Sequence, residues 1–284
     1  MRQFIIKFIK VSFLFFITLC GIICIRYIYT TQIFSWELPK EKHILFMGAS
    51  HIEHGIDDTL TKSGYNFAKS SERYLFTYLK LTHLLETNTQ IDTIFLECAP
   101  TDLWEHTDDK YFNSNEMSLY PSLYYPLFKK EEWAIYKNNV RDITVTILQQ
   151  CLKSHFWGQN RYWHALGGKK ENNTQQMDTT KVYPHLEQGS HGHQINYKYL
   201  RKIINLCTMH NVKLYLLYCP VYKPEYSYNQ DYYYDMYKKN FSDVELLDYS
   251  HWSVNDNERY DAHHLNNKGA IKFTNELKKR FRIK

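Results

Sequence analysis

Two short motifs near opposite ends of the chain carry residue types that suit acyl transfer. Gly48-Ala49-Ser50-His51 contains a serine, and Asp261-Ala262-His263-His264 contains a carboxylate and a histidine three positions apart. A serine hydroxyl becomes a nucleophile when a histidine removes its proton, and a carboxylate holds that histidine in the required tautomer. The spacing lets Asp261 reach one ring nitrogen of His264 while the other points at Ser50. We therefore predict a catalytic triad of these three residues.

The segments around the two motifs predict an α/β domain. Apolar runs typical of buried strands occur at residues 44–47, 91–98, 212–219 and 244–248. Segments that we predict as helices occur at residues 73–86, 131–153, 197–210, 232–240 and 266–281. Strands that alternate with helices indicate a doubly wound parallel sheet, whose ligands bind beyond the carboxyl ends of the strands. Ser50 lies just past the first predicted strand.

The N-terminal segment predicts a transmembrane helix. Residues 11–25 carry no charge, and the apolar stretch extends over residues 8–28 when Lys10 and Arg26 snorkel. That length satisfies the about 20 residues that a bilayer core requires. Basic residues precede the stretch, so the positive-inside rule predicts a cytoplasmic N-terminus and an extracytoplasmic remainder. A cleaved signal peptide is the alternative, although no small-x-small cleavage site follows the apolar run.

These patterns divide the chain into three parts. Residues 1–30 form the predicted single-pass anchor, and residues 31–42 form a linker. Residues 43–284 form the α/β domain. A polar stretch around residues 156–194, with paired glycines and paired asparagines, is predicted to be an extended loop or insertion within that domain.

Composition and motif spacing exclude several other functions. The net charge is +5, but no long basic stripe with interleaved aromatic residues occurs, so nucleic acid is not an expected partner. The cysteines beyond the anchor form no C-x-x-C pair, and we expect Cys98 and Cys219 to be buried thiols, with one or two disulfides as the alternative. No H-E-x-x-H frame supports a metal site. The histidines considered for such a site are His51, His54, His185, His191 and His193. We predict neither a metal nor a cofactor.

The two end motifs together resemble those of the SGNH (GDSL-type) hydrolase superfamily. The resemblance covers roughly residues 43–280, and only the two motifs are specific. It implies a flavodoxin-like fold, with Ser50 as nucleophile, His264 as base and Asp261 as the residue that orients the base. The predicted anchor makes the chain similar to the extracytoplasmic branch, which includes O-acetylation proteins of alginate and peptidoglycan. An α/β-hydrolase would need G-x-S-x-G, and Ile52 stands in place of the second glycine.

The chain departs from the family pattern at the residues that would bind an oxyanion. The second family block supplies a glycine amide, but the corresponding segment, residues 65–71, contains no glycine. The third block supplies an asparagine, which Thr101 replaces here. The backbone N–H of Ser50 is therefore the first expected donor, with Asn66 as a second. His51, beside the nucleophile, is predicted to line the pocket.

The expected function is serine-dependent transfer or hydrolysis of an O-linked acyl group, with acetyl as the expected group. The substrate would be an extracytoplasmic or cell-envelope glycan or a small ester. Because acetyl-coenzyme A is cytoplasmic, transfer would require an acyl donor, for which we expect a separate integral membrane acyltransferase. The alternative is a non-catalytic glycan-binding or assembly protein on a degenerate SGNH scaffold, which the altered oxyanion segments favour.

Overall fold

The computed structural model describes the chain except residues 104–110, 113, 152–158, 169–172, 181–193 and 224–229. The described residues form two compact units. One unit comprises residues 1–35 and 112–165, and the other comprises residues 36–111 and 166–284. The predicted domain at residues 43–284 is thus divided, because the helices between residues 112 and 165 group with the N-terminal helix. Of the predicted polar insertion, most lies outside the described residues.

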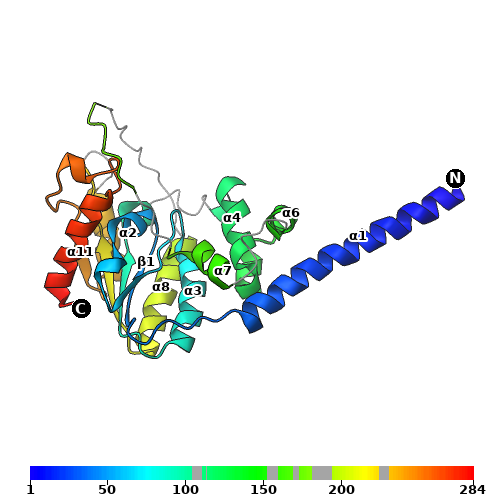
Figure 1. Cartoon of the computed structure of the whole chain (residues 1–284), viewed down its shortest axis with the longest axis horizontal. Helices are drawn as coiled ribbons and strands as arrows, with labels where there is room; N and C mark the ends of the chain where they lie inside the picture. The colour runs from blue at the N-terminus through cyan, green and yellow to red at the C-terminus, as the bar shows by residue number, and fades with distance from the viewer. Residues whose placement is uncertain (104–110, 113, 152–158, 169–172, 181–193, 224–229) are drawn as a thin grey trace. The chain divides into compact units, whose positions relative to one another are not determined.

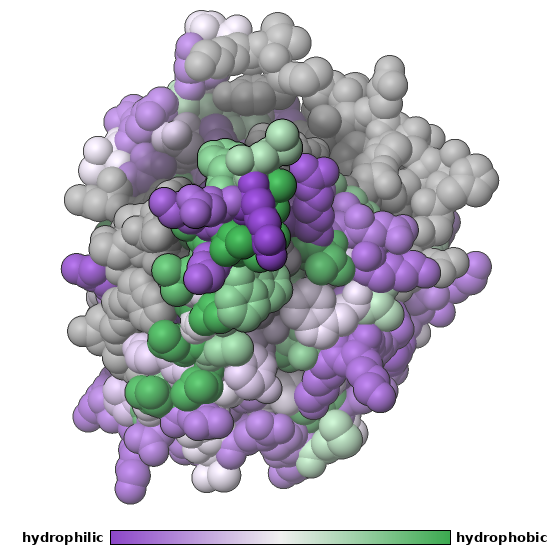
Figure 2. All heavy atoms as spheres, turned by 90° about the vertical axis from the view of Figure 1, so that its right-hand side faces the viewer, coloured by the Kyte–Doolittle hydropathy of each residue, from purple (hydrophilic) through white to green (hydrophobic). Residues whose placement is uncertain are grey.

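The first unit is built on the long helix α1 (Arg2–Ile28), which is drawn in blue (Figure 1). Among the described residues it is the one helix that is long and apolar enough to cross a membrane, judged by length and composition. Figure 2 looks along α1 from its N-terminal end and shows hydrophobic side chains at the surface of this face. Exposed apolar side chains on an isolated helix are costly in water, and a lipid environment would remove that cost.

Arg26 does not snorkel as the sequence suggested. Its side chain is fully buried, and its guanidinium lies over the ring of Tyr162, 4.0 Å from the ring centroid. Tyr162 belongs to α7 (Gln159–Leu166), a helix within the stretch that we predicted as an extended loop. This short helix was not foreseen within the predicted loop or insertion, because a polar average over residues 156–194 hides its apolar side. A cation over an aromatic face gains energy that partly offsets the loss of hydration.

Two short helices of this unit replace one long predicted helix. Where the sequence predicts one helix at residues 131–153, the described residues form α5 (Lys130–Ile135) and α6 (Val140–Cys151), which a turn at residues 136–139 separates. The turn buries the ring of Tyr136 against Phe128, with the two rings stacked at 5.6 Å. Helix α4 (Ser114–Tyr124) precedes them and packs on α6.

The second unit holds a five-stranded parallel sheet with helices on both faces (Figure 1). The strands are β1 (Ile44–Met47), β2 (Gly64–Asn66), β3 (Thr93–Glu97), β4 (Lys213–Tyr218) and β5 (Leu246–Asp248). Their order is β2-β1-β3-β4-β5, and every pairing is parallel. The predicted parallel α/β fold is confirmed, and 2-1-3-4-5 is the order of flavodoxin-type doubly wound sheets.

Helices α2 (Ser50–Gly55) and α11 (Asn267–Phe281) cover one face of the sheet. Side chains that alternate along the strands, such as Phe46 and Phe95, pack there against Phe273 and Leu277 in one buried cluster. Helices α3 (Tyr74–Thr87) and α8 (Gln194–Met209) pack against each other on the other face. A further helix, α10 (Gln230–Phe241), precedes β5.

The strand order fixes where a ligand can bind. In a doubly wound sheet the chain leaves the first strand toward one side and later strands toward the other, and a crevice opens where the direction changes. In this sheet the change falls between β1 and β3, which pair along Ile44–Met47 and Thr93–Leu96. Ser50 follows β1 and Glu97 ends β3. The two residues therefore meet at the crevice.

Candidate active site

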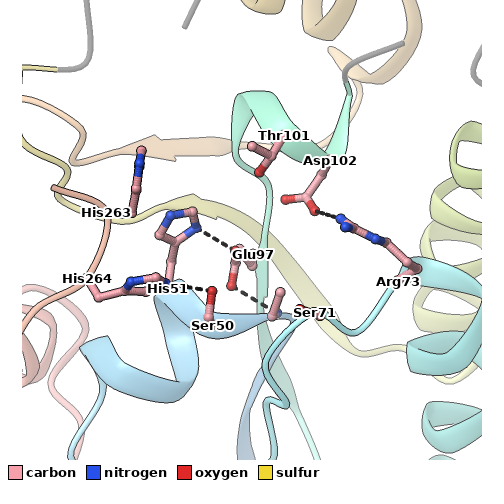
Figure 3. A pocket seen from close by; sticks show the side chains of 10 residues that line it. Ser50, His51, Ser71, Arg73, Glu97, Thr101, Asp102, His263 and His264 are labelled. Carbon is pink, nitrogen blue, oxygen red and sulfur yellow. Dashed lines mark hydrogen bonds and ion pairs between the residues drawn. The ribbon is translucent and has the colours of Figure 1, made fainter. Parts of the chain in front are cut away.

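The turn that carries Ser50 is tightly packed against the end of β3. Gly48 has a φ of +133°, and a Cβ added to it would lie 2.3 Å from the Cβ of Glu97. Only glycine fits this position, because other residues rarely adopt that φ and no other has room. The chain then turns into α2, which starts at Ser50. This geometry presents the serine hydroxyl to a pocket at the carboxyl ends of the strands (Figure 3).

The structure brings the three residues of the predicted triad together. His264 Nε2 lies 2.8 Å from Ser50 Oγ, and His264 Nδ1 lies 2.9 Å from each carboxylate oxygen of Asp261. The histidine and the carboxylate come from the loop between β5 and α11. With the proton on Nδ1, the ring donates to Asp261 and accepts the serine proton at Nε2, which is the arrangement that general-base catalysis requires.

Asp261 is ionised over the whole physiological range of pH. Burial raises its pKa, but the hydrogen bond and charge of His264 and the backbone N–H groups of His263 and His264 outweigh burial and lower the pKa to about 2. Both N–H groups donate to Oδ1 of Asp261, at 2.7 and 2.8 Å. These bonds hold the carboxylate in the plane where it meets the imidazole. His263 itself lines the pocket, and burial, followed by the charge of His51, lowers its pKa to about 4.

Two of the three further predicted site residues lie in the pocket. His51 and Thr101 line it, whereas Asn66 does not. The Asn66 side chain is turned beneath α2, where Nδ2 donates to the carbonyl oxygens of Ile52 and Ile56 at 3.0 and 2.9 Å. The prediction of Asn66 as an oxyanion donor is thus wrong. Carbonyl groups at the end of a helix lack helical partners, and Asn66 supplies a donor to the Ile56 carbonyl and a second donor to the Ile52 carbonyl, which also accepts the N–H of Ile56.

Ser71 is a pocket residue that was not predicted from the sequence. It lines the pocket and has a φ of +62°, in the left-handed region that glycine favours. Its neighbour Ser70 donates to the carboxylate of Glu53 from both the backbone N–H and the hydroxyl. That anchoring keeps the turn in its strained conformation. Residues 65–71 were named from the sequence as a segment without a glycine, and Ser71 is the residue of that segment that lines the pocket.

Glu97 is the most important residue of the site that was not predicted from the sequence. Its side chain is 3% exposed, and Oε1 lies 2.7 Å from Nδ1 of His51. Oε2 accepts the backbone N–H groups of Ala49 and Ile52, at 2.9 and 3.1 Å. One carboxylate therefore fixes the residues on both sides of Ser50. A glutamate at the carboxyl end of an otherwise apolar strand is the signal that would have revealed it.

Two further charged residues line the pocket. Asp102 accepts the backbone N–H of Ala99, and its carboxylate lies 4.0 Å from a guanidinium nitrogen of Arg73. Burial, and then the negative charge of Glu97, raise the pKa of Asp102 to about 7, against the opposing effects of the Ala99 N–H and Arg73. Asp102 therefore exchanges its proton near neutral pH.

The pocket is small. Its volume is about 160 Å³. The lining includes Ser50, the histidines His51, His263 and His264, and the hydroxyl residues Ser71 and Thr101. A water molecule occupies about 30 Å³ of liquid, so the cavity equals roughly five waters. A short acyl group such as acetyl fits that space.

Within the residues that the structure describes, no group of three or more His, Cys, Asp or Glu side chains could hold a metal ion. His185, His191 and His193 lie outside those residues. Cys98 and Cys219 are buried free thiols, and burial raises the pKa of Cys98 to about 12, so its reactive thiolate is suppressed.

Comparison of the sequence with known protein families and with curated proteins finds no match. The geometry of the pocket therefore carries the functional argument.

Proposed function

We propose that the protein is a serine-dependent enzyme that transfers or hydrolyses an O-linked acyl group through an acyl-enzyme on Ser50. The observation that carries the proposal is the continuous hydrogen-bonded chain from Ser50 Oγ through His264 to Asp261, with distances of 2.8 and 2.9 Å. The roles that the resemblance to SGNH hydrolases assigns to these residues agree with that chain.

Acylation follows from this arrangement. Ser50 Oγ attacks the carbonyl carbon of an ester while His264 Nε2 takes the hydroxyl proton. The tetrahedral intermediate then collapses, the bond to the leaving oxygen breaks, and His264 returns the proton to that oxygen. A sugar hydroxyl or water attacks the acyl-enzyme in the same way, and its proton passes through His264 back to Ser50.

Stabilisation of the oxyanion needs donors near Ser50. The backbone N–H of Ser50 is the first, as in serine hydrolases generally. Ser71 and Thr101 carry hydroxyl groups that line the same pocket and replace the Asn66 side chain in this role. Loss of one such donor typically costs about 10²–10³ in rate.

The proposed substrate is an acyl ester of an extracytoplasmic or cell-envelope glycan, with acetyl as the acyl group. The pocket volume supports a short acyl group, and the apolar helix α1 supports attachment to a membrane with the α/β unit outside the cytoplasm. An integral membrane acyltransferase is the proposed acyl donor, and co-purification in mild detergent tests that partnership.

One observation favours the alternative, a glycan-binding or assembly protein without catalysis. The only side-chain amide that the sequence offered for the oxyanion is used to cap α2. A binding protein would tolerate Ser50→Ala without loss of function, whereas an acyltransferase would not.

The test is active-site labelling of the full-length chain in detergent with a fluorophosphonate, followed by mass spectrometry of the adduct. We expect labelling at Ser50 that disappears in Ser50→Ala and in His264→Ala. Ser253→Ala, which alters an exposed serine, serves as the matched control and keeps the label. No label on the folded wild-type chain would favour the binding protein.

A further inference from the structure

A second histidine–carboxylate pair lies beside the predicted triad. His51 and His264 are stacked with ring centroids 5.4 Å apart and planes 28° apart. His51 is held at Nδ1 by Glu97, as His264 is held at Nδ1 by Asp261. The remaining ring nitrogens differ: Nε2 of His264 faces Ser50, whereas the edge of His51 opposite Glu97 faces the side of the pocket where His263 lies (Figure 3).

The two members of the buried pair shift each other's pKa. Burial lowers the pKa of His51, but the charge and hydrogen bond of Glu97 outweigh burial and raise the pKa above its ordinary value. Burial likewise raises the pKa of Glu97, but His51 and the N–H groups of Ile52 and Ala49 outweigh burial and lower the pKa. Both directions favour an imidazolium beside a carboxylate.

A protonated His51 can act only as a hydrogen-bond donor. Both ring nitrogens carry protons, so the ring has no lone pair with which to accept one and cannot act as a second base. Nδ1–H is bound to Glu97, and Nε2 has no hydrogen-bond partner among the residues that the structure describes. Since His51 lines the pocket, Nε2–H is available to an acceptor oxygen of a ligand.

We propose that His51 donates a hydrogen bond from Nε2 to an oxygen of the bound ester or acyl-enzyme, and that Glu97 is the positioning residue that holds both His51 and the turn of Ser50. This inference rests on the proposed acyl transfer. The two stacked histidines then have different roles: His264 accepts and returns the proton, and His51 supplies a charged hydrogen-bond donor. Charged donors form hydrogen bonds roughly twice as strong as neutral ones, which offsets the missing asparagine of the oxyanion site.

Other ionisable groups around His51 come from several segments. They are Glu97 and Asp102 at the end of β3, Arg73 before α3, His54 on α2, and Asp261, His263 and His264 after β5. Glu97 is the one that forms a hydrogen bond to the ring. A variant that changes Glu97 alone therefore isolates the source of the positive charge.

Glu97→Gln is the decisive variant. Glutamine has the same shape, its oxygen accepts the two backbone N–H groups, and its amide donates to Nδ1 of a neutral His51. The variant removes the charge and keeps the hydrogen bonds. His51→Gln removes the ring and keeps a neutral N–H donor. His210→Gln, which alters an exposed histidine in the same unit, is the matched control.

The first measurement is the ¹⁵N spectrum of histidine-labelled full-length protein in lipid nanodiscs, with His51 assigned from His51→Gln. We expect His51 to lose its second ring proton at a higher pH in the wild type than an ordinary imidazole does, and at a lower pH in Glu97→Gln than in the wild type. A ring that titrates near its ordinary pKa of about 6.5 in both proteins would overturn the inference.

The second measurement is the rate of Ser50 acylation by a soluble acetyl ester. We expect His51→Gln and Glu97→Gln each to lower kcat by up to about 10²-fold with little change in KM, because a charged donor to the transition state is replaced by a neutral, weaker one. The double variant should lose little more than either alone, since the two residues act as one unit. Wild-type kcat in His51→Gln would overturn the contact.

The two measurements separate this inference from the proposed function. Acylation of wild-type Ser50 with unchanged kcat in His51→Gln contradicts the inference alone. Failure of wild-type Ser50 to acylate, in a folded protein with a protonated His51, contradicts the proposed function and with it the contact to the ester.

Discussion

The two histidine–carboxylate pairs of the pocket differ in burial and in what their carboxylates hold. The side chains of His51 and Glu97 are 7% and 3% exposed, whereas those of His264 and Asp261 are 21% and 33% exposed. Glu97 binds its histidine and two N–H groups of the nucleophile turn; Asp261 binds its histidine and N–H groups of its own loop.

We therefore expect the two histidine–carboxylate pairs to have different roles, although their hydrogen bonds are similar. The loop pair, which orients the base in the proposed mechanism, is the more exposed, so we expect its loss to disturb the fold little. The buried pair is part of the packing between β1 and β3, so its removal affects both the fold and the chemistry. Variants of each pair test this distinction.

The largest expected effect on rate comes from Asp261→Asn. The amide donates to Nδ1 of His264 and leaves the proton on Nε2, so the ring cannot accept the proton of Ser50. A comparable substitution in a serine protease lowers kcat about 10⁴-fold. We expect a loss of about 10³–10⁴ in the rate of Ser50 acylation, measured with an acetyl ester, and a thermal midpoint close to that of the wild type. Asp231→Asn, at an exposed position, should retain the wild-type rate. A large loss of stability in Asp261→Asn would contradict the contrast between the pairs.

The largest expected effect on stability comes from Glu97→Ala. It leaves a buried histidine without its counter-charge and two buried N–H groups without their acceptor. Breaking a buried ion pair by removal of one partner costs about 3–5 kcal/mol. We expect a fall of that size in the free energy of unfolding, measured by denaturant titration in detergent. Glu245→Ala, at an exposed position before β5, should change it by less than about 0.5 kcal/mol. Equal stability in the two variants would show that Glu97 is not a structural residue.

A smaller effect is expected from Asn66→Ala, which tests the capping role of this side chain. The change removes the amide that donates to the Ile56 carbonyl, whereas the Ile52 carbonyl keeps the backbone N–H of Ile56. A buried acceptor without a partner costs about 1–3 kcal/mol. We expect that loss of stability, with the labelling rate of Ser50 per folded molecule unchanged. Asn205→Ala, on the exposed side of α8, is the control. A loss of labelling of about 10²-fold at equal stability would instead indicate that Asn66 binds the oxyanion.

The smallest effect is the dependence of stability on pH. The raised pKa of His51 contributes stability that is complete below about pH 6.5 and is lost as the pH rises through the pKa in the folded protein. The lowered pKa of Glu97 contributes stability above about pH 4.5 that is lost as the pH falls through its folded value. We therefore expect a maximum of the thermal midpoint between those limits, which Glu97→Gln flattens by about 2–4 °C. Glu245→Gln should follow the wild type, and identical curves for all three proteins would refute the ionic state of the pair.

Much of the fold was predictable from local patterns. Apolar runs of strand length separated by helical segments gave the parallel α/β sheet, since buried parallel strands are continuously apolar. The three-residue strand β2 was missed because Gly64–Asn66 contains a glycine, a tyrosine and an asparagine rather than an apolar run. The break between α5 and α6 was missed because it depends on where Tyr136 packs, which sequence spacing does not reveal.

The site was predictable where its residues are close in sequence. Asp261 and His264 are three positions apart, so their contact follows from the chain itself. His51 and Glu97 are 46 positions apart, and only the pairing of β1 with β3 brings them together. Asn66 was chosen because it lies in the segment compared with the second family block, residues 65–71, whereas its side chain turns under α2.

The central claim, that Ser50 is a nucleophile activated by His264, is tested most directly by trapping the acyl-enzyme. Full-length protein in detergent would be incubated with p-nitrophenyl acetate, quenched in acid and analysed by peptide mass spectrometry. We expect one added acetyl group on the peptide that contains Ser50, absent from Ser50→Ala and greatly reduced in His264→Ala. Acetylation of lysines alone, with Ser50 unmodified in the folded wild-type protein, would contradict it.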